Sequence, residues 1–283
     1  MTAASLPGEG ELRLGPITLP AGKQVRAGFR PASVAWVTGQ AVPEPGLVWA
    51  GLSAAHPETG LVPFLLGTLP GDPARPWDTG DFGEPTDPAR LDDMNAADVL
   101  ADMWEGEVPS DEEEEAAGYS YIAALRRALS LPDEEVEPFA AMIAPFSKKF
   151  PGLAPPGDTP LSPGQLSETL GSLAAARIGL VPATRGADVL PLIGWTPSDQ
   201  SDAMPIAAVV RSWEHRFGAR LLRVGFAEIS LLIERPPRSL EHAQRIAAEH
   251  FAFCDECAGQ GLHDIPAIAA NLMKTPIWTF WWD

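Results

Sequence analysis

The chain has 283 residues, 45% of them hydrophobic, with 38 acidic and 20 basic side chains and a net charge of −18. This length and apolar content suit two domains with sizeable cores, whereas the acidic balance argues against nucleic-acid binding, because phosphate contacts require clustered Lys and Arg. No stretch reaches the ~20 apolar residues of a membrane span, and the first twelve residues lack the basic and apolar regions of an export signal, so we expect no membrane association and a cytoplasmic location.

The N-terminal elements are predicted to be short strands between turns rich in Pro and Gly. Residues 33–38 and 46–52 are strand-like, and so are residues 60–67, where an internal proline favours an edge position in a sheet. The residues at 56–60 are those of a tight reversal. We therefore expect a β-hairpin over about residues 46–67.

A strongly acidic segment follows these strands. Between Asp78 and Glu137 the chain holds 19 acidic and 3 basic residues, whereas the remainder holds 19 acidic and 17 basic ones. Residues 92–104 show a helical stripe of apolar side chains with acids opposite, and the acidic run after them is predicted to be a solvated loop. The run consists of Asp111, Glu112, Glu113, Glu114 and Glu115. The segment is interpreted either as a surface for a basic protein or as a solvated surface that keeps the protein soluble.

The C-terminal residues show the clearest pattern. We divide the chain into a β-rich and acidic helical region at 1–150, a linker rich in Pro and Gly at 151–165, and a domain at 166–283. The strands expected in this domain are 175–182, 188–195, 219–226, 228–235 and the closing residues from Trp278, and the expected helices are 204–217, about 240–257 and about 265–274. This order is typical of the α+β class, with a mostly antiparallel sheet and helices packed on one face. Gly218, Ser239 and Asp264 are expected to cap the helices.

The last six residues contain three tryptophans. Strand alternation places Trp278, Phe280 and Trp282 on one face and Trp281 on the other. We expect the first face to be core. Trp281 is either covered by the N-terminal region, which we favour, or exposed as an anchor for a partner, a role typical of tryptophan.

Several separated motifs of the C-terminal domain occur together in one family. They are Ala187-Asp188-Val189, Gly194-Trp195, Arg211-Ser212-Trp213-Glu214, Phe217-Gly218-Ala219, Glu234-Arg235-Pro236-Pro237, Ala248-Glu249-His250-Phe251, Phe253-Cys254 and Trp278-Thr279-Phe280-Trp281-Trp282-Asp283. In this order they resemble the bacterial family known as domain of unknown function 4253, over roughly residues 170–283. The resemblance implies a shared fold for this part. It implies no catalytic residue, because no activity is established for the family.

A possible zinc set is formed by His250, Cys254, Cys257 and His263, the first three of which share one face of a predicted helix. The same face carries an ordinary stripe of core residues, and structural zinc sites usually take their ligands from turns. Two cysteines three positions apart cannot form a disulfide framework. We therefore favour buried side chains over a metal site and predict no cofactor.

A second hypothesis concerns a ligand cleft between the N-terminal region and the C-terminal domain, a common location for binding sites. Its candidate lining residues are Trp195, Trp213, Glu249, His250 and Trp281. The adjacent Glu249 and His250 suggest acid–base chemistry, but neighbouring helix residues point about 100° apart. We expect one of the two to be buried and hydrogen-bonded and the other to be exposed.

The basic residues at 211–238 offer a further possibility. A cluster with Arg211, Arg216, Arg220 and Arg223 could hold a carboxylate or phosphate, but Glu214, Glu228 and Glu234 are interleaved with it and favour local ion pairs. No phosphate-binding loop, nucleophile elbow or zinc-protease motif occurs. We therefore predict a non-catalytic, immunity- or inhibitor-like protein whose acidic surface binds a basic protein; the alternative is an enzyme or small-ligand-binding protein with a cleft.

Overall fold

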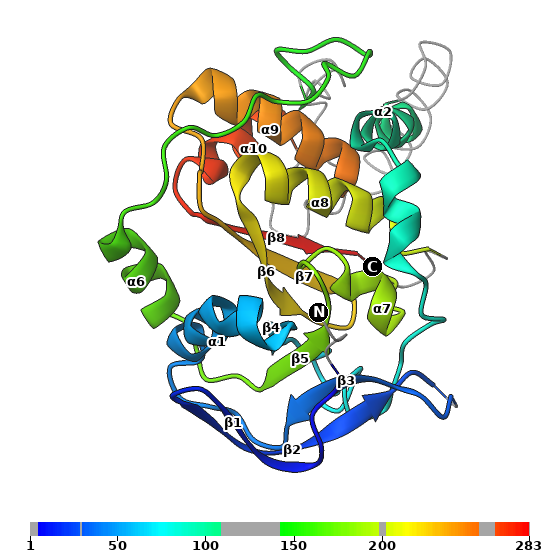
Figure 1. Ribbon diagram of the computed structural model, residues 1–283. Coiled ribbons are helices and arrows are strands. Elements are labelled where there is room, and N and C mark those ends of the chain that lie inside the picture. Colours follow the sequence, from blue (N-terminus) through cyan, green and yellow to red (C-terminus); the bar gives the residue numbers. More distant parts are fainter. Residues whose placement is uncertain (1–4, 29, 109–141, 198–201, 255–263, 283) are drawn as a thin grey trace, which may run out of the picture. The chain divides into compact units, whose positions relative to one another are not determined.

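The computed structural model shows an α+β protein with one mixed sheet of eight strands, and the described residues also form eight helices (Figure 1). The residues that it describes are 5–28, 30–108, 142–197, 202–254 and 264–282. The chain divides into two compact units, each made of separate segments. Unit 1 comprises Met1–Ala96, Pro156–Pro236 and Thr275–Asp283, and unit 2 comprises Ala97–Pro155 and Pro237–Lys274. The predicted α+β class is confirmed.

Unit 1 contains the whole sheet, with the strand order β1-β2-β3-β5-β4-β6-β7-β8. The strands are β1 (Gly10–Leu14), β2 (Ile17–Arg26), β3 (Ser33–Thr38), β4 (Leu61–Leu66), β5 (Ile178–Pro182), β6 (Ala219–Val224), β7 (Glu228–Ile233) and β8 (Ile277–Trp281). Neighbouring strands pair antiparallel except β4 and β6, which are parallel. Because β5 lies between β3 and β4, strands from both halves of the chain share this sheet.

The described residues of unit 1 form five helices. They are α1 (Pro45–Thr59), η1 (Pro88–Asp93), α6 (Pro163–Gly171), α7 (Val189–Ile193) and α8 (Met204–Phe217). Helix α8 has the predicted bounds, and it ends at Gly218 with the left-handed backbone (φ 62°) expected of a glycine cap. Helix α1 contacts β4, β1 and β2, and α8 contacts β6 and α7.

Two strand predictions were wrong, and both segments are helices. Residues 46–52 lie in α1, so the predicted hairpin over 46–67 is a helix followed by β4; Pro45 stands in the first turn and Gly60 (φ 65°) ends the helix. Residues 188–195 contain the short helix α7, which stops at the left-handed Gly194 (φ 68°). Short apolar runs have the same appearance in buried strands and buried helices, and the glycines at the ends of these two runs were the stronger signal.

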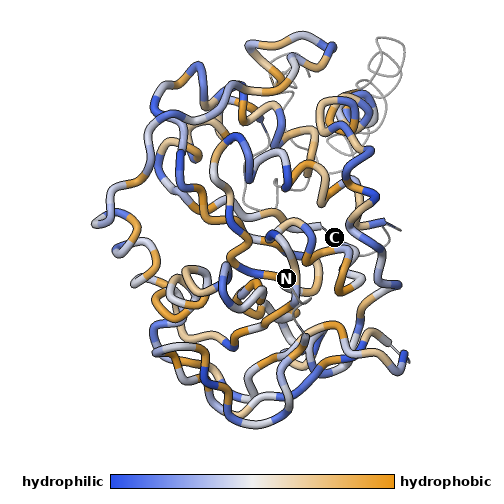
Figure 2. Tube along the Cα trace, in the orientation of Figure 1, coloured by the Kyte–Doolittle hydropathy of each residue, from blue (hydrophilic) through white to orange (hydrophobic). Residues whose placement is uncertain are grey.

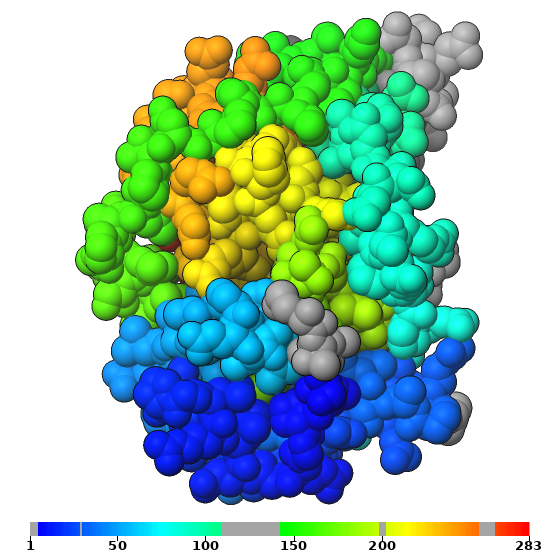
Figure 3. Space-filling model, viewed as in Figure 1, coloured from blue at the N-terminus to red at the C-terminus, as the bar shows by residue number. Residues whose placement is uncertain are grey.

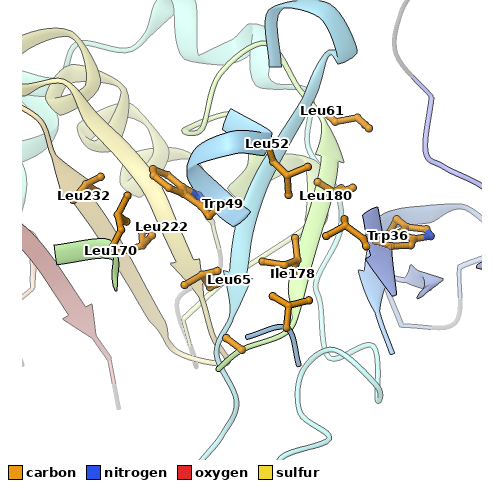
Figure 4. Packing of buried hydrophobic residues seen from close by; sticks show 13 residues of the cluster. Trp36, Trp49, Leu52, Leu61, Leu65, Leu170, Ile178, Leu180, Leu222 and Leu232 are labelled. Carbon is orange, nitrogen blue, oxygen red and sulfur yellow. The ribbon is translucent and has the colours of Figure 1, made fainter. Parts of the chain in front are cut away.

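The core of unit 1 joins α1 and α6 to the middle of the sheet. Figure 4 shows Leu52 of α1 pointing toward the strand that carries Leu180, and Trp49 of α1 beside the strand that carries Leu222. Hydrophilic and hydrophobic residues alternate along β1 (Figure 2), and its leucines are the residues packed against this core. Burial of apolar surface on this scale supplies most of the favourable free energy of folding.

The parallel pair of strands β4 and β6 is short and is bracketed by two tryptophan side chains. Only Leu65 and Leu66 of β4 are paired with β6. Toward the start of β4, Trp49 Nε1 donates hydrogen bonds to the carbonyl oxygens of Pro63 (3.0 Å) and Leu221 (3.1 Å). At the other end, Trp77 Nε1 donates to the carbonyl oxygens of Gly67 (3.0 Å) and Val224 (3.2 Å). Each indole thus links a carbonyl group in β4 or directly after it to a carbonyl group of β6, and we call these contacts the tryptophan bridges.

Pro63 was predicted to favour an edge strand, and this prediction was wrong. The first tryptophan bridge explains how a proline can be tolerated in a central strand. Pro63 lies in β4, between β5 and β6, and not in an edge strand. A proline has no N–H to donate to a neighbouring strand. Here the indole of Trp49 provides the donor between the two strands at this level.

The aromatic end of the chain is strand β8, which pairs with β7 as the last strand of the sheet. Trp278, Phe280 and Trp282 are buried, as predicted from strand alternation. Trp278 and Phe280 both pack on Trp213 of α8, with ring centroids 5.4 Å and 5.2 Å away. The intermediate exposure of Trp281 on the opposite face completes the predicted alternation.

Unit 2 is helical in its described residues. Helix α2 (Ala96–Glu107) belongs to it from Ala97 on, together with α9 (Leu240–Phe253) and α10 (Ile265–Leu272), which pack on each other. Ser239 Oγ accepts from His242 N (3.2 Å) and Asp264 Oδ1 accepts from Ala267 N (2.6 Å), so both predicted caps are confirmed. Among the described helices none has the length and apolarity required to cross a membrane.

Candidate functional site

A pocket of about 250 Å³ opens on unit 1 between α1, α8 and the beginning of β6. Figure 3 shows the hollow between the light-blue surface of α1 and the yellow surface of α8. Its lining residues are Trp49, Ser53, His56, Val62, Pro63, Thr184, Arg185, Gly186, Glu214, Ala219, Arg220 and Leu221. The lining combines an apolar base with four ionisable side chains, the composition expected of a site for a small polar molecule.

The position of the pocket follows from the first tryptophan bridge. The pairing of β4 with β6 is confined to Leu65 and Leu66, and the two strands contribute Pro63 and Leu221 to the pocket before that point. The buried indole of Trp49 lies between these residues and forms part of the base. Because α1 and α8 both end here, at Gly60 and Gly218, side chains from their last turns also reach the pocket.

The two arginines of the pocket each pair with a carboxylate that is not part of the pocket lining. Arg220 Nη1 donates to Glu234 Oε1 (3.3 Å), and its guanidinium lies 4.8 Å from the ring centroid of Trp49. Arg185 Nε lies 3.7 Å from Asp188 Oδ2. The Arg185 and Arg220 side chains remain 41% and 35% exposed, so both guanidinium groups are accessible to a ligand.

The histidine of the pocket has a defined tautomer. His56 Nε2 lies 2.8 Å from the carbonyl oxygen of Ala183. A carbonyl can only accept, so Nε2 carries the hydrogen, and in the neutral ring Nδ1 is then the acceptor. His56 is a residue of the last turn of α1, and this hydrogen bond fixes its ring to the segment that follows β5.

Glu214 is the carboxyl group of the pocket with the strongest electrostatic perturbation. Burial raises its pKa to about 7, and the nearby Asp188 acts in the same direction. A hydrogen bond from Ala187 N to Glu214 Oε1 (2.8 Å) and the charges of Arg185 and Arg211 oppose this rise. Burial also raises the pKa of Asp188. Perturbed carboxyl groups in a pocket are typical of functional sites, and Glu214 can change its charge near neutral pH.

Glu214 should give the protein a measurable pH dependence of stability. Because its pKa is higher in the folded state, the folded protein holds this proton between about pH 4.5 and pH 7 while the unfolded chain has lost it. Raising the pH through this window therefore lowers the contribution of Glu214 to the free energy of unfolding. In E214Q this decline is expected to be absent, as measured by urea denaturation from pH 4.5 to 8; parallel curves for wild type and E214Q would contradict it.

The five residues predicted to line a cleft belong to both units. Trp195 and Trp213 are buried in unit 1, and Trp281 of β8 is half-buried there; Glu249 and His250 of α9 are in unit 2. Ala154 N donates to Glu249 Oε1 (2.6 Å). Burial lowers the pKa of His250 to about 3. The expectation that one member of the Glu249–His250 pair would be exposed was wrong, since both are buried. That these five residues line one cleft stays a prediction.

The other predicted sites lie partly or wholly outside the described residues. Asp111, Glu112, Glu113, Glu114 and Glu115 are outside them, as are Cys257 and His263 of the possible zinc set. Cys254 follows α9 and is buried, and its N–H donates to the carbonyl oxygen of His250 (3.0 Å). Within the ranges that the structure describes, no three His, Cys, Asp or Glu side chains gather as a metal site would require.

The sequence interpretation missed the pocket of unit 1. Arg220 was considered as part of a cluster that could hold a carboxylate or phosphate, but local ion pairs with residues such as Glu214 were favoured, and His56 was considered only as part of a turn. Arg220 does pair with Glu234 as that interpretation favoured, whereas Glu214 accepts from a backbone N–H. A glutamate in the last turn of an amphipathic helix, where the helix dipole disfavours negative charge, was the available signal.

Comparison with protein families finds a match for the C-terminal part of the chain. Residues 177–283 match the family model of the domain of unknown function DUF4253. The predicted resemblance of the C-terminal part is therefore confirmed. The matched segment contains β5 to β8 and the pocket residues Arg185, Glu214 and Arg220. Comparison with curated proteins and with solved structures finds no match.

Proposed function

We propose that this protein binds a small polar molecule in the pocket of unit 1. The observation that supports the proposal is the convergence of Arg185, His56, Glu214 and Arg220 around one hollow with an apolar base. Sites for small molecules combine an apolar lining with a few placed polar groups in this way. The four side chains come from α1, the segment after β5, α8 and β6, so their meeting depends on the fold and not on a local repeat.

The proposed activity is binding and not catalysis. Each ionisable group is oriented by a protein partner: Arg185 by Asp188, Arg220 by Glu234, His56 by the Ala183 carbonyl and Glu214 by Ala187 N. Groups held in this way are suited to recognise a ligand without a large loss of side-chain entropy. Nucleophilic catalysis would require, in addition, a nucleophile that is activated by a base within hydrogen-bond distance.

A large side chain introduced on α1 so that it fills the pocket should abolish ligand binding. Ser53 lines the pocket, whereas its neighbour Ala54 is exposed and does not. We expect a small molecule retained by the wild-type protein, purified from its own host at low salt, to be retained by A54F and lost from S53F. Native mass spectrometry measures this directly. A small molecule that stays bound in S53F, with the fold intact by circular dichroism, would place the site elsewhere.

A second candidate function is the binding of a basic protein, which the distribution of acidic side chains supports. Of the six acids of the acidic segment that precede α2, four are in ion pairs: Asp78 with Lys23 and Arg177, Asp81 with Arg75, Glu84 with Arg30 and Asp92 with Arg211. On α2, in contrast, Asp98, Asp102 and Glu105 are exposed and recur at the spacing of one helix face. The buried Leu100 and Trp104 lie at other positions of the same helix.

Charge removal tests this second candidate. We expect D98N/D102N/E105Q, combined with neutral residues at Asp111 to Glu115, to lose a basic protein that co-purifies with wild type at low salt. Raising the salt concentration should weaken the same interaction, because surface charges are screened. The control is E58Q, which removes an exposed carboxyl group of α1 in unit 1. Unchanged affinity of the neutralised variant for every co-purifying partner would exclude this function.

A further inference from the structure

We infer that the ligand of the unit 1 pocket is a small zwitterion that carries both a carboxylate and an amine, the chemistry of a free amino acid. The inference rests on the proposed function and names its ligand class. Three features of the pocket lead to it: the balance of its charges, the direction of the two helices that end there, and its size.

The charges of the pocket favour a ligand with both signs. Arg185 and Arg220 present two guanidinium groups, and Glu214 presents a carboxyl group, all in the same lining. Asp188 and Glu234, which pair with Arg185 and Arg220, partly offset the charge of the two arginines. A ligand with only negative charge meets the Glu214 carboxylate, and one with only positive charge meets two guanidinium groups. A zwitterion can satisfy both without a net charge.

The arginines provide the carboxylate half of the site. A guanidinium has five N–H donors in a planar fork that matches a carboxylate. The ion pair of Arg220 with Glu234 involves one of its nitrogens, Nη1, and that of Arg185 with Asp188 involves Nε at 3.7 Å. The Trp49 ring beneath Arg220, 4.8 Å from its guanidinium, holds this side chain over the base of the pocket.

The helix ends provide the amine half. Glu214 and His56 both lie in the last turns of their helices, α8 and α1. The C-terminal end of a helix carries a partial negative charge, which attracts a cation. The Glu214 carboxyl adds a full negative charge when ionised, and its Oε1 is held by Ala187 N. An ammonium group therefore finds its most favourable position beside Glu214.

The size of the pocket limits the rest of the ligand. Sites for drug-sized molecules begin at about 300 Å³, whereas this pocket measures about 250 Å³. Its lining includes the apolar, buried residues Trp49, Val62, Pro63 and Leu221. The ligand is thus a molecule of amino-acid size with a modest side chain.

The affinity for a zwitterion and the affinity for an anion are expected to change in opposite directions with pH. Glu214 must be ionised to hold an ammonium, and its pKa of about 7 means that roughly a tenth is ionised at pH 6 and nine tenths at pH 8. The other charged or titratable groups that face it are Arg185 and Asp188 after β5, Arg211 of α8, His56 of α1 and Arg220 of β6. Comparison of wild type with E214Q isolates the part of the pH dependence that is due to Glu214.

The test is isothermal titration calorimetry of the full chain with each of the twenty standard amino acids, at pH 6 and pH 8. For the best binder, the matched carboxylic acid without the amine and the matched amine without the carboxylate are titrated as well. We expect one or more amino acids to bind wild type roughly tenfold more tightly at pH 8 than at pH 6. Both analogues should bind at least about tenfold more weakly than the parent. E214Q should lose the pH dependence, R220Q should weaken binding, and S53F should abolish it while A54F does not.

The outcomes separate this inference from the proposed function. If a carboxylic acid binds as well as the amino acid, or if its affinity falls as pH rises, and S53F abolishes that binding, the zwitterion inference is overturned and small-molecule binding stands. If no amino acid binds, the inference is also overturned. If, in addition, S53F and wild type retain the same co-purified small molecule, the proposed function of this pocket fails with it.

Discussion

Replacing Trp278 with alanine is expected to lower the free energy of unfolding by about 3–5 kcal/mol, the range for removing a large aromatic from a core. The Trp278 side chain is 2% exposed. Its ring meets those of Trp213 and Phe217 in edge arrangements, with centroids 5.4 Å and 5.5 Å apart. Truncation to alanine therefore removes both the burial of an indole and two aromatic contacts between β8 and α8. Guanidinium denaturation followed by far-ultraviolet circular dichroism measures the loss.

Trp281 supplies the matched control for this substitution. It lies on the same strand, three residues away, and points to the opposite face with intermediate exposure. W281A removes a side chain of identical size that is less buried than Trp278. The expected loss in the free energy of unfolding is therefore smaller, about 1 kcal/mol. Equal losses for W278A and W281A would mean that the two faces of β8 contribute alike, which contradicts the packing described above.

Replacing Gly194 with alanine is expected to cost about 2–5 kcal/mol, for two reasons that add. Gly194 ends α7 with a φ of 68°, a conformation that costs a residue with a side chain about 1–2 kcal/mol. A Cβ atom at this position would also lie 2.4 Å from the carbonyl oxygen of Gly83 and 2.8 Å from its carbonyl carbon. Because these are backbone atoms that cannot rotate away, overpacking adds about 1–3 kcal/mol.

The same substitution at Gly15 distinguishes the backbone cost from the cost of overpacking. Its φ is 57°, similar to that of Gly194, but no heavy atom lies within 4 Å of a Cβ built there. G15A should therefore show only the backbone cost of about 1–2 kcal/mol. Thermal and chemical denaturation of both variants measure the difference. A loss in G15A as large as that in G194A would attribute the whole effect to the backbone and none to the contact with Gly83.

Local signals were sufficient for many elements of this fold. The bounds of α8 follow from an amphipathic stripe and the glycine at 218, and the start of α9 follows from Ser239. The burial of alternate residues in β8 follows from the strand period alone. Local signals were not sufficient for α1, because its first apolar residues match a strand equally well and the helix is defined by its ends at Pro45 and Gly60.

The pocket could not be predicted because it depends on contacts between distant parts of the chain. The base forms where Trp49 reaches carbonyl groups at Pro63 and Leu221, the second of which is 172 positions away in sequence. The raised pKa of Glu214 results from its burial, with Asp188 nearby as a further cause. Neither effect leaves a motif, because composition reports which side chains are present and not which of them lose contact with water.

The strand order of the sheet determines what the family-matched segment, residues 177–283, can do when separated from the rest of the chain. Within that segment β5 and β6 are consecutive strands, yet in the sheet β4 lies between them and β3 lies on the far side of β5. A fragment that starts at residue 177 would carry β5 without either neighbour and β6 with one row of backbone N–H and C=O groups open to solvent. Such a row recruits any extended segment that fits it. The missing strand β4 could be restored by a peptide added in trans, so the fragment would act as a receptor for residues 61–66 of its own parent chain.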